Sequence, residues 1–196
     1  ADGLDAADAD AAREYLQKTS DTHARMEAII GDVLTIAREG KTVEETEQVS
    51  LATAARDAWA NVDTRDATLA VDADRTLQAD RSKLLTVFEN IFRNALDHGP
   101  DGVTVGIEAT SDGFYVEDDG PGISPEHADS VFEYGYTTTD EGTGLGLSIV
   151  RTMAESHGWT VELETPTGRE STGTRFIFTD VGGGPVVDDQ EPHPTR

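Results

Sequence analysis

The segment Arg81–His98 constrains the fold more than any other, because it is the strongest stretch with the apolar period of a helix. Its apolar side consists of Leu84, Leu85, Val87, Phe88, Ile91, Phe92 and Ala95. The turn sequence Gly99-Pro100-Asp101-Gly102 then ends the helix. A helix with so wide an apolar side has to pack against a second layer of structure.

Shorter segments on both sides of this helix predict what that second layer is. We expect two more helices, over Leu51–Val62 and Leu145–His157, and a short extended segment around Val49. Strands are expected over Thr68–Val71, Thr76–Ala79, Val103–Ala109, Phe114–Glu117, Trp159–Glu164 and Thr174–Thr179. The middle pair forms a hairpin through Ser111-Asp112-Gly113. The predicted fold is therefore α/β, with a mixed sheet packed on three helices.

Outside this unit, the chain is expected to carry one long amphipathic helix over Arg13–Arg38, ended by Glu39-Gly40. One side of this helix has the apolar repeat of a coiled coil, which predicts packing against a partner helix. The residues of this seam are Leu16, His23, Met26, Ile30, Val33 and Ala37. We expect residues 1–12 to be a frayed lead-in, residues 41–48 a linker, and the Gly/Pro/acid-rich residues 181–196 a disordered tail.

The charge balance narrows the possible partners. The chain has 39 acidic and 15 basic residues, a formal charge of −24, and only three lysines. Such a chain repels polyanions, so nucleic-acid binding is not expected. A Lys-poor acidic surface on a folded core favours adaptation to molar salt over an ordinary acidic protein. No apolar run reaches a membrane span, and the absence of cysteine excludes disulfides and thiolate metal sites.

Three polar or glycine-rich motifs follow one another within the predicted α/β unit. Asn90 and Asn94 are four residues apart on the strongest helix, so both amides project from one face. The sequence Asp118–Ile123 (DDGPGI) follows a strand and offers a carboxylate beside two glycines. The sequence Gly142–Val150 (GTGLGLSIV) leads glycines into a helix, whose N-terminal N–H groups favour an anion such as phosphate. Each motif is weak evidence when taken alone.

In this order and spacing, the three motifs resemble the GHKL, or Bergerat-fold, ATP-binding domain, and within it the catalytic domain of sensor histidine kinases. Phe88–Gly99 resembles the N box, and the other two motifs resemble the two glycine boxes. Val131-Phe132-Glu133 resembles the F box, and Gly173-Thr174-Arg175-Phe176 the closing strand. The resemblance covers about residues 49–180, and Arg13–Arg38 looks like the second helix of the kinase dimerisation hairpin. The acidic character of the sequence also resembles that of haloarchaeal kinases.

The resemblance implies a set of ATP-binding residues. They are Asn90, Asn94, Asp97, His98, Asp118, Gly120, Gly122, Ile123, Gly142, Thr143, Gly144, Leu145, Gly146, Leu147 and Thr174. Within this set, Asn94 would coordinate Mg²⁺ with Asn90 assisting at the phosphates, and Asp118 would accept the adenine amino group. Gly120 and Gly122 would shape the base pocket, which Thr174 contacts. The glycines of Gly142–Gly146 would line the triphosphate site and hinge a lid over about Ser124–Glu141.

Two departures from the family pattern stand out. The predicted lid contains no Lys or Arg, and Asp97 stands where Lys is frequent, so His98, Mg²⁺, the helix N-terminus or an Arg from elsewhere has to balance the phosphate charge. The usual phosphoacceptor histidine is followed by an acid, whereas Ala24 and Arg25 follow His23. We therefore expect no catalytic acceptor and no self-phosphorylation in this sequence, which reads as a kinase without its acceptor helix.

The resulting expectation is a protein-histidine kinase of a two-component phosphorelay. With ATP and Mg²⁺, it would pass the γ-phosphate to a histidine on another helix and then to a response regulator. A homodimer in the full-length kinase and a cytoplasmic location, soluble or membrane-attached, follow from the same resemblance. Two alternatives stay open: a hydrolytic ATPase of the same superfamily, disfavoured because Asn90 stands where those enzymes place glutamate, and a non-catalytic, ATP-gated interaction module.

Overall fold

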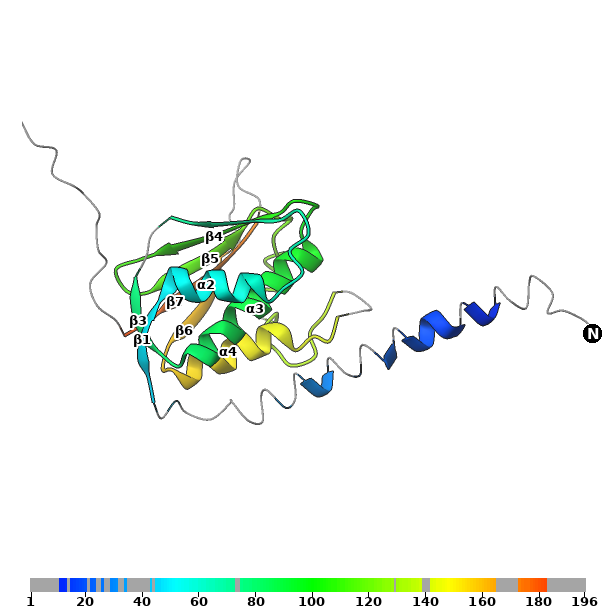
Figure 1. Ribbon diagram of the computed structural model, residues 1–196, viewed down its shortest axis with the longest axis horizontal. Helices are drawn as coiled ribbons and strands as arrows, with labels where there is room; N and C mark the ends of the chain where they lie inside the picture. The colour runs from blue at the N-terminus through cyan, green and yellow to red at the C-terminus, as the bar shows by residue number, and fades with distance from the viewer. Residues whose placement is uncertain are drawn as a thin grey trace, which may run out of the picture.

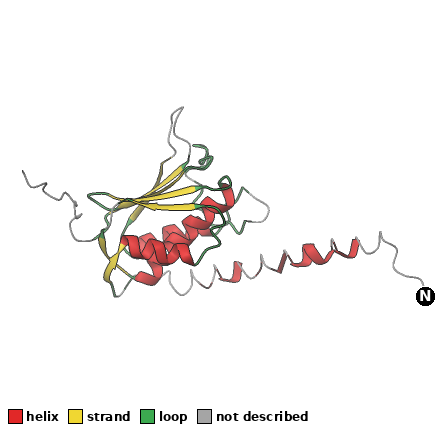
Figure 2. Ribbon diagram, turned by 45° about the horizontal axis from the view of Figure 1, so that its top comes forward, coloured by secondary structure: helices red, strands yellow, loops and turns green. Residues whose placement is uncertain are grey.

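The computed structural model describes residues 11–13, 15–20, 22–23, 26, 29–31, 34, 43, 45–72, 75–128, 130–138, 142–164 and 173–182. Its main body has two layers, a twisted sheet and a group of helices that covers one face of that sheet (Figure 1, Figure 2). This arrangement confirms the predicted α/β sandwich.

The main sheet has five strands in the order β2-β4-β5-β7-β6. Their bounds are Thr68–Val71 for β2, Thr104–Ala109 for β4, Phe114–Asp118 for β5, Thr160–Glu164 for β6 and Thr174–Thr179 for β7. β2 runs parallel to β4, and the other pairs are antiparallel. In this register Asp118, the last residue of β5, lies opposite Thr174 on β7.

A second, two-stranded sheet pairs β1 (Glu47–Ser50) with β3 (Thr76–Ala79) in antiparallel register. It lies at the start of two helices. The Ser50 hydroxyl accepts a hydrogen bond from the Thr53 N–H at 3.2 Å and caps α2 (Leu51–Ala60). The Asp80 carboxylate accepts the Ser82 N–H at 2.9 Å and caps α3 (Arg81–His98). These caps satisfy N–H groups that a helix leaves unpaired at its start.

The core lies between the sheet and the three helices α2, α3 and α4 (Gly146–Ser156). Its largest members are aromatic rings that are buried almost completely: Phe88, Phe92, Phe114, Trp159, Phe176 and Phe178. Phe114 stacks on Phe178 at a centroid distance of 4.6 Å and meets Phe88 at 5.8 Å. Burying each such ring stabilises the fold by about 1.5–3 kcal/mol.

At the end of α4, the half-buried imidazole of His157 packs beside the core. The His157 Nε2 accepts the Asp80 N–H at 3.0 Å, and its Nδ1 lies 2.8 Å from the Met153 carbonyl oxygen. The ring stacks on Trp159 at 4.2 Å. His157 therefore joins the end of α4 to the cap of α3, and this bonding requires the neutral ring with its proton on Nδ1.

Arg75, just before β3, is buried more deeply than His157, with 6% of its surface exposed. Its guanidinium donates hydrogen bonds to the carbonyl oxygens of Thr110, Gly113 and Val181. The start of β3, the β4–β5 hairpin and Val181, two residues after β7, are thereby joined. Val181 is buried and Gly182 accepts the Gln78 N–H, so these two residues belong to the fold and not to a disordered tail.

Most predicted element bounds agree with the structure to within two residues, and those of α3 agree fully. α2 ends at Ala60 and not at Val62, because the Asn61 and Val62 N–H groups turn back to carbonyls three residues earlier. α4 begins at Gly146 and ends at Ser156, one residue inside its predicted bounds at each end. β5 continues to Asp118 because this residue pairs with β7.

In the N-terminal region, every described residue between 11 and 34 is helical, including Ala11 and Ala12, which were expected to be frayed. The apolar side chains Tyr15, Leu16, Met26, Ile30 and Leu34 are exposed there, and the segment extends beyond the two-layer body (Figure 1). Val33, Ala37 and the predicted helix end lie outside the described residues. Among the helices that the structure describes, none combines the length and the apolar character that a membrane crossing requires.

Candidate functional site

A cavity of about 790 Å³ opens between α3, the end of β5, the residues that follow it and the start of α4. This volume is in the range of small-molecule sites. The sequence-predicted residues that line it are Asn90, Asn94, Asp97, His98, Asp118, Gly122, Ile123, Gly142, Thr143, Gly144, Gly146, Leu147 and Thr174. Gly120 and Leu145 are not among the lining residues: Gly120 is buried and bonds to Asp118, and Leu145 packs against the core.

Asp118 provides the half-buried carboxylate of the cavity. Its Oδ1 accepts the Gly120 N–H at 2.8 Å, and Thr174 on the neighbouring strand also hydrogen-bonds to the carboxylate. Burial nevertheless raises the pKa of Asp118 above its ordinary value, because desolvation outweighs these stabilising hydrogen bonds. A carboxylate in this setting gains from a ligand that donates hydrogen bonds to it.

The residues after Asp118 fold back over this carboxylate. Gly122 has a φ of +76°, and a Cβ atom there would lie 2.7 Å from the Gly173 carbonyl oxygen. Only glycine fits such a position without strain. Pro121, Gly122 and Ile123 thus bring the backbone to the edge of the cavity, as expected for the DDGPGI motif.

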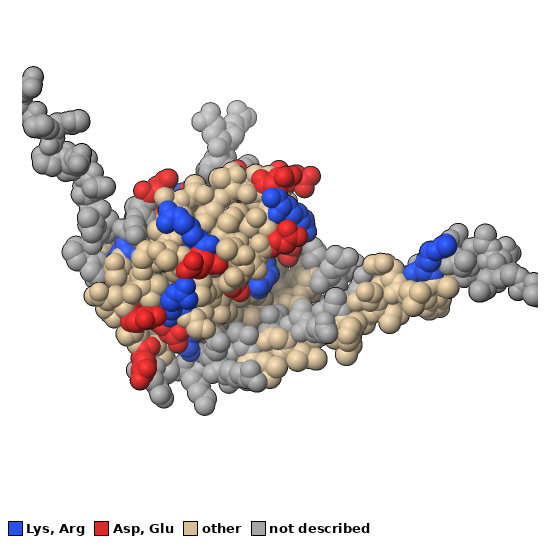
Figure 3. Space-filling view, in the orientation of Figure 1, with Lys and Arg blue, Asp and Glu red and all other residues tan. Residues whose placement is uncertain are grey.

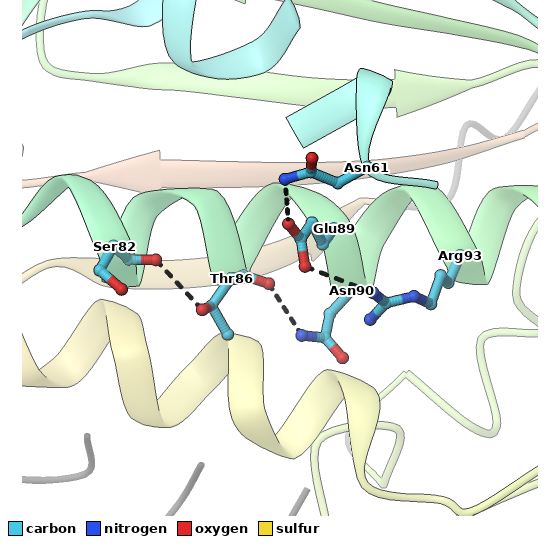
Figure 4. A network of polar contacts seen from close by, with 6 residues as sticks. All are labelled: Asn61, Ser82, Thr86, Glu89, Asn90 and Arg93. Carbon is cyan, nitrogen blue, oxygen red and sulfur yellow. Dashed lines mark hydrogen bonds and ion pairs between the residues drawn. The ribbon is translucent and has the colours of Figure 1, made fainter. Parts of the chain in front are cut away.

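On the α3 side, the two amides that the spacing predicted lie on the cavity wall. The Asn90 Nδ2 donates to the Thr86 carbonyl oxygen at 2.8 Å, which leaves Oδ1 directed towards the start of α4 (Figure 4). A Cβ atom on Gly146 would lie 3.3 Å from this Oδ1, so the glycine allows α4 to approach α3 closely. Both amides can present oxygen, the atom type that Mg²⁺ prefers.

The glycine loop forms the remaining wall. Gly144 has a φ of +70°, and its carbonyl oxygen accepts the Gly135 N–H at 2.9 Å, which joins the loop to the residues that follow the F-box-like segment. α4 begins without a side-chain cap. The first N–H groups of such a helix, together with its dipole, favour an anionic group.

Sequence reasoning assigned no role to two basic side chains that line the cavity, Arg93 and His127. Arg93 is three residues after Asn90, so the helical period of α3 could have indicated it. Its Nη2 lies 3.3 Å from the Glu89 Oε2, and the Glu89 Oε1 accepts the Asn61 amide at 2.9 Å (Figure 4). His127 comes from the predicted lid, and its ring lies 5.8 Å from that of Tyr136; no periodic pattern pointed to it.

Within the described residues, no three His, Asp or Glu side chains converge in a way that could hold a metal ion. A magnesium ion at Asn90 and Asn94 would therefore need further oxygen atoms, which the phosphates of a bound nucleotide offer. The amide oxygens on the cavity wall fit such a shared site.

The charges on the visible surface are mixed. On the two-layer body, as seen in Figure 3, most basic side chains lie near acidic ones, and the described residues form no continuous basic area there. Arg81, for example, pairs with Asp57 at 2.6 Å.

Comparison with known proteins identifies the class. A family model described as "Histidine kinase-, DNA gyrase B-, and HSP90-like ATPase" matches residues 79–180, which is more than half of the chain. The chain therefore belongs to this family. The matched range contains Asn90, Asn94, Asp118, the glycine loop and Thr174.

The curated relatives compared with this chain are sensor proteins, two of them named sensor histidine kinases. The chain is 34% identical to the sensor histidine kinase ZraS of Escherichia coli K12 over 124 residues, 60% of this chain and 27% of that protein. It is 37% identical to the sensor histidine kinase CpxA of the same strain over 111 residues, 52% of this chain and 23% of that one. It is 30% identical to the sensor protein IrlS of Burkholderia pseudomallei over 178 residues, which are 80% of this chain and 37% of that protein. The chain thus spans about a quarter to two fifths of these relatives.

Solved structures show the same fold. The catalytic domain of the histidine kinase ThkA superposes with a TM-score of 0.57 at 27% identity, over 68% of this chain and 93% of that one. The mycobacterial sensor histidine kinase MprB superposes with a TM-score of 0.62 over 71% and 99%. At 24% identity, MprB supports the fold alone.

Proposed function

We propose that this chain is the ATP-binding catalytic part of a sensor histidine kinase, which transfers the γ-phosphate of ATP to a histidine on a separate helix. The observation that carries the proposal is that one cavity is lined by the half-buried Asp118, the amides of Asn90 and Asn94, and the glycine loop before α4. The similarity to ZraS and CpxA supports the kinase branch of the family.

At one end of the cavity, Asp118 would accept the amino group of adenine. The carboxylate already holds the Gly120 N–H on Oδ1, so an amino donor is the partner that relieves its desolvation. Guanine carries a carbonyl oxygen in place of that amino group and would face the carboxylate with a lone pair. We expect ATP to bind at micromolar to millimolar dissociation constants, about −4 to −8 kcal/mol, and GTP to bind far more weakly.

At the other end, Asn94 would hold Mg²⁺ through its amide oxygen, with Asn90 assisting. Magnesium supplies neutralisation of the phosphate charge and orientation of the γ-phosphate. The N-terminus of α4 adds N–H groups and the positive end of its dipole. The segment Ser124–Glu141 would act as a lid that hinges at the glycine loop and excludes water during transfer.

The acceptor is expected on a helix other than the one carrying His23, because Ala24 and Arg25 follow this residue where an acid is needed to orient the imidazole. We propose a homodimer of the complete kinase as the setting for transfer, and the receiver domain of a response regulator as the next partner. Because the proposed reaction uses ATP, we propose a cytoplasmic location for the domain.

Hydrolysis of ATP is the weaker alternative. The ATPases of this superfamily activate water with a glutamate four residues before the magnesium-binding asparagine, and Asn90 occupies that position. The adjacent Glu89 is bonded to Asn61 and Arg93 on the flank of α3. A neutral amide at position 90 is not a general base.

Two assays test the proposal. Calorimetric titration with Mg-ATP and Mg-GTP should show binding of ATP only, and Asp118→Ala should abolish that selectivity. Asp101→Asn, an exposed acid in the turn after α3, serves as the matched control that retains it. Radiolabelled ATP should then label a supplied acceptor helix in an acid-labile, base-stable form without comparable release of phosphate. Phosphate release without labelling would instead favour the ATPase.

A further inference from the structure

Arg93 is the one Lys or Arg side chain among the described residues that line the cavity. The segment Ser124–Glu141 adds none, because its sequence contains neither residue type. The other charged groups on the cavity wall are the carboxylates of Asp97 and Asp118. A polyphosphate entering this cavity therefore meets acidic side chains and a single permanent cation.

Arg93 lies at the phosphate end of the cavity. It is on the same side of α3 as Asn90, and its guanidinium leans back along the helix towards Glu89 (Figure 4). Asn90 marks the position where α4 begins, because its Oδ1 lies 3.3 Å from the place of a Cβ on Gly146. Asp118, which holds the base in the proposed function, closes the opposite end at the tip of β5.

The bond that holds Arg93 can be exchanged. Its Nη2 is 3.3 Å from Glu89, and its side chain is 52% exposed, so this i,i+4 pair is a weak surface interaction. The Glu89 carboxylate has a second partner, the Asn61 amide at 2.9 Å, and would keep that partner if the guanidinium left. A phosphate is a stronger acceptor, because guanidinium binds it through two parallel charge-assisted hydrogen bonds.

We propose that Arg93 leaves Glu89 when nucleotide binds and contacts its terminal phosphates, taking the place of the cation that the lid lacks. This inference rests on the proposed function, since it assigns a phosphate-binding residue within the same cavity. Glu89 then acts as a competing acceptor that sets how much of the Arg93 interaction is available to the nucleotide.

The test measures Mg²⁺-supported binding of AMP, ADP and ATP by calorimetry to the chain and three variants. Arg93→Gln should weaken ATP about tenfold, the scale of one charge-assisted hydrogen bond. The same variant should weaken the binding of ADP less than that of ATP, and it should leave the binding of AMP unchanged. Glu89→Gln keeps an acceptor for Asn61 but removes the competing charge, so it should tighten ATP binding about twofold to threefold, within the weak range of surface pairs.

Arg81→Gln is the matched control. Arg81 is an arginine on the same helix with a comparable exposure of 46%, it pairs with Asp57, and it does not line the cavity. It should leave all three affinities unchanged. Equal losses for AMP, ADP and ATP in Arg93→Gln, unchanged ATP binding in that variant, or weaker or unchanged binding in Glu89→Gln would each overturn the inference while the proposed function stood. A chain that binds no ATP would remove both proposals.

Discussion

Strand β5 begins at Phe114 and ends at Asp118, and the two ends of this one strand lie in opposite surroundings. We call the end with Asp80, Phe114, His157 and Trp159 the closed end, and the end with the cavity the open end. Burial lowers the pKa of His157 and raises that of Asp118, so the same desolvation opposes the charged form at both places. At the closed end, however, both ring nitrogens of His157 have protein partners.

The two ends therefore differ in role: contacts at the closed end stabilise the fold, and groups at the open end are available to bind a ligand. At the closed end, the buried surfaces of the aromatic rings contact one another, and a ligand could not improve these contacts. At the open end, a desolvated carboxylate, a glycine-built wall and an uncapped helix start leave interactions that a ligand can complete. Substitutions at the two ends should therefore move different quantities.

The largest effect is expected from Phe114→Ala at the closed end. The ring is fully buried among Phe88, Phe178 and Trp159, so its removal should lower the free energy of unfolding by about 3–5 kcal/mol. Chemical denaturation gives this value. Ile123→Ala, a half-buried residue of the cavity wall, serves as the open-end control and should lose less than about 1.5 kcal/mol. Similar losses in the free energy of unfolding at both positions would contradict the assignment of stability to the closed end.

Asn94→Ala should change binding and leave folding nearly intact. Removal of the proposed magnesium ligand should weaken Mg-ATP about 100-fold, equivalent to about 2.7 kcal/mol, and binding should no longer respond to Mg²⁺. Titrations with and without magnesium measure both effects. Unchanged magnesium dependence in the variant would show that Asn94 is not the ligand.

Asp118→Asn should move stability and binding in opposite directions. Because the pKa of Asp118 is raised in the folded state, the unfolded chain releases this proton first as the pH rises, so the ionised carboxylate lowers stability at neutral pH. The neutral amide should raise the melting temperature at pH 7 and weaken ATP at least about tenfold. The stability gain should disappear below pH 3.8, the ordinary value for aspartate. A variant less stable than the parent at pH 7 would contradict the sign of the shift.

At the closed end, His157 should give the opposite pH dependence. Its folded-state pKa is lowered from 6.5 by burial, although the Met153 carbonyl and the Asp80 charge oppose the shift and Lys83 adds to it. As the pH falls below 6.5, the unfolded chain takes up the proton first and the fold loses stability. One proton limits this slope to about 1.4 kcal/mol per pH unit. His157→Gln should remove that part of the slope below pH 6.5, as measured by chemical denaturation at a series of pH values.

Salt is expected to have the smallest effect on the difference in stability between closed-end and open-end variants. Molar KCl screens repulsion over the whole surface of a chain with a charge of −24, so it should raise the melting temperature of all variants together. The differences between closed-end and open-end variants should change little, because buried contacts are hardly screened. A melt that is flat between dilute and molar KCl would contradict the adaptation to high salt.

The sequence predicted elements whose signals are local. α3 has its predicted bounds because Asp80 caps its start and Gly99 follows its end, and the three site motifs depend on spacing along the chain. The parallel pairing of β2 with β4 and the separate β1–β3 sheet could not be read locally, since pairing depends on contacts between distant segments. His127 was missed for a related reason, because a side chain in an irregular segment has no periodic pattern that marks its direction. Arg93 could have been found from its spacing to Asn90 on α3.

Arg75 has a consequence for the order in which the molecule is made. Its three carbonyl acceptors lie 35, 38 and 106 residues further along the chain. A ribosome adds about 5–20 residues per second, so the nascent chain holds this arginine without its last acceptor for seconds. Folding of the domain can therefore finish only after residue 181 has emerged from the ribosome.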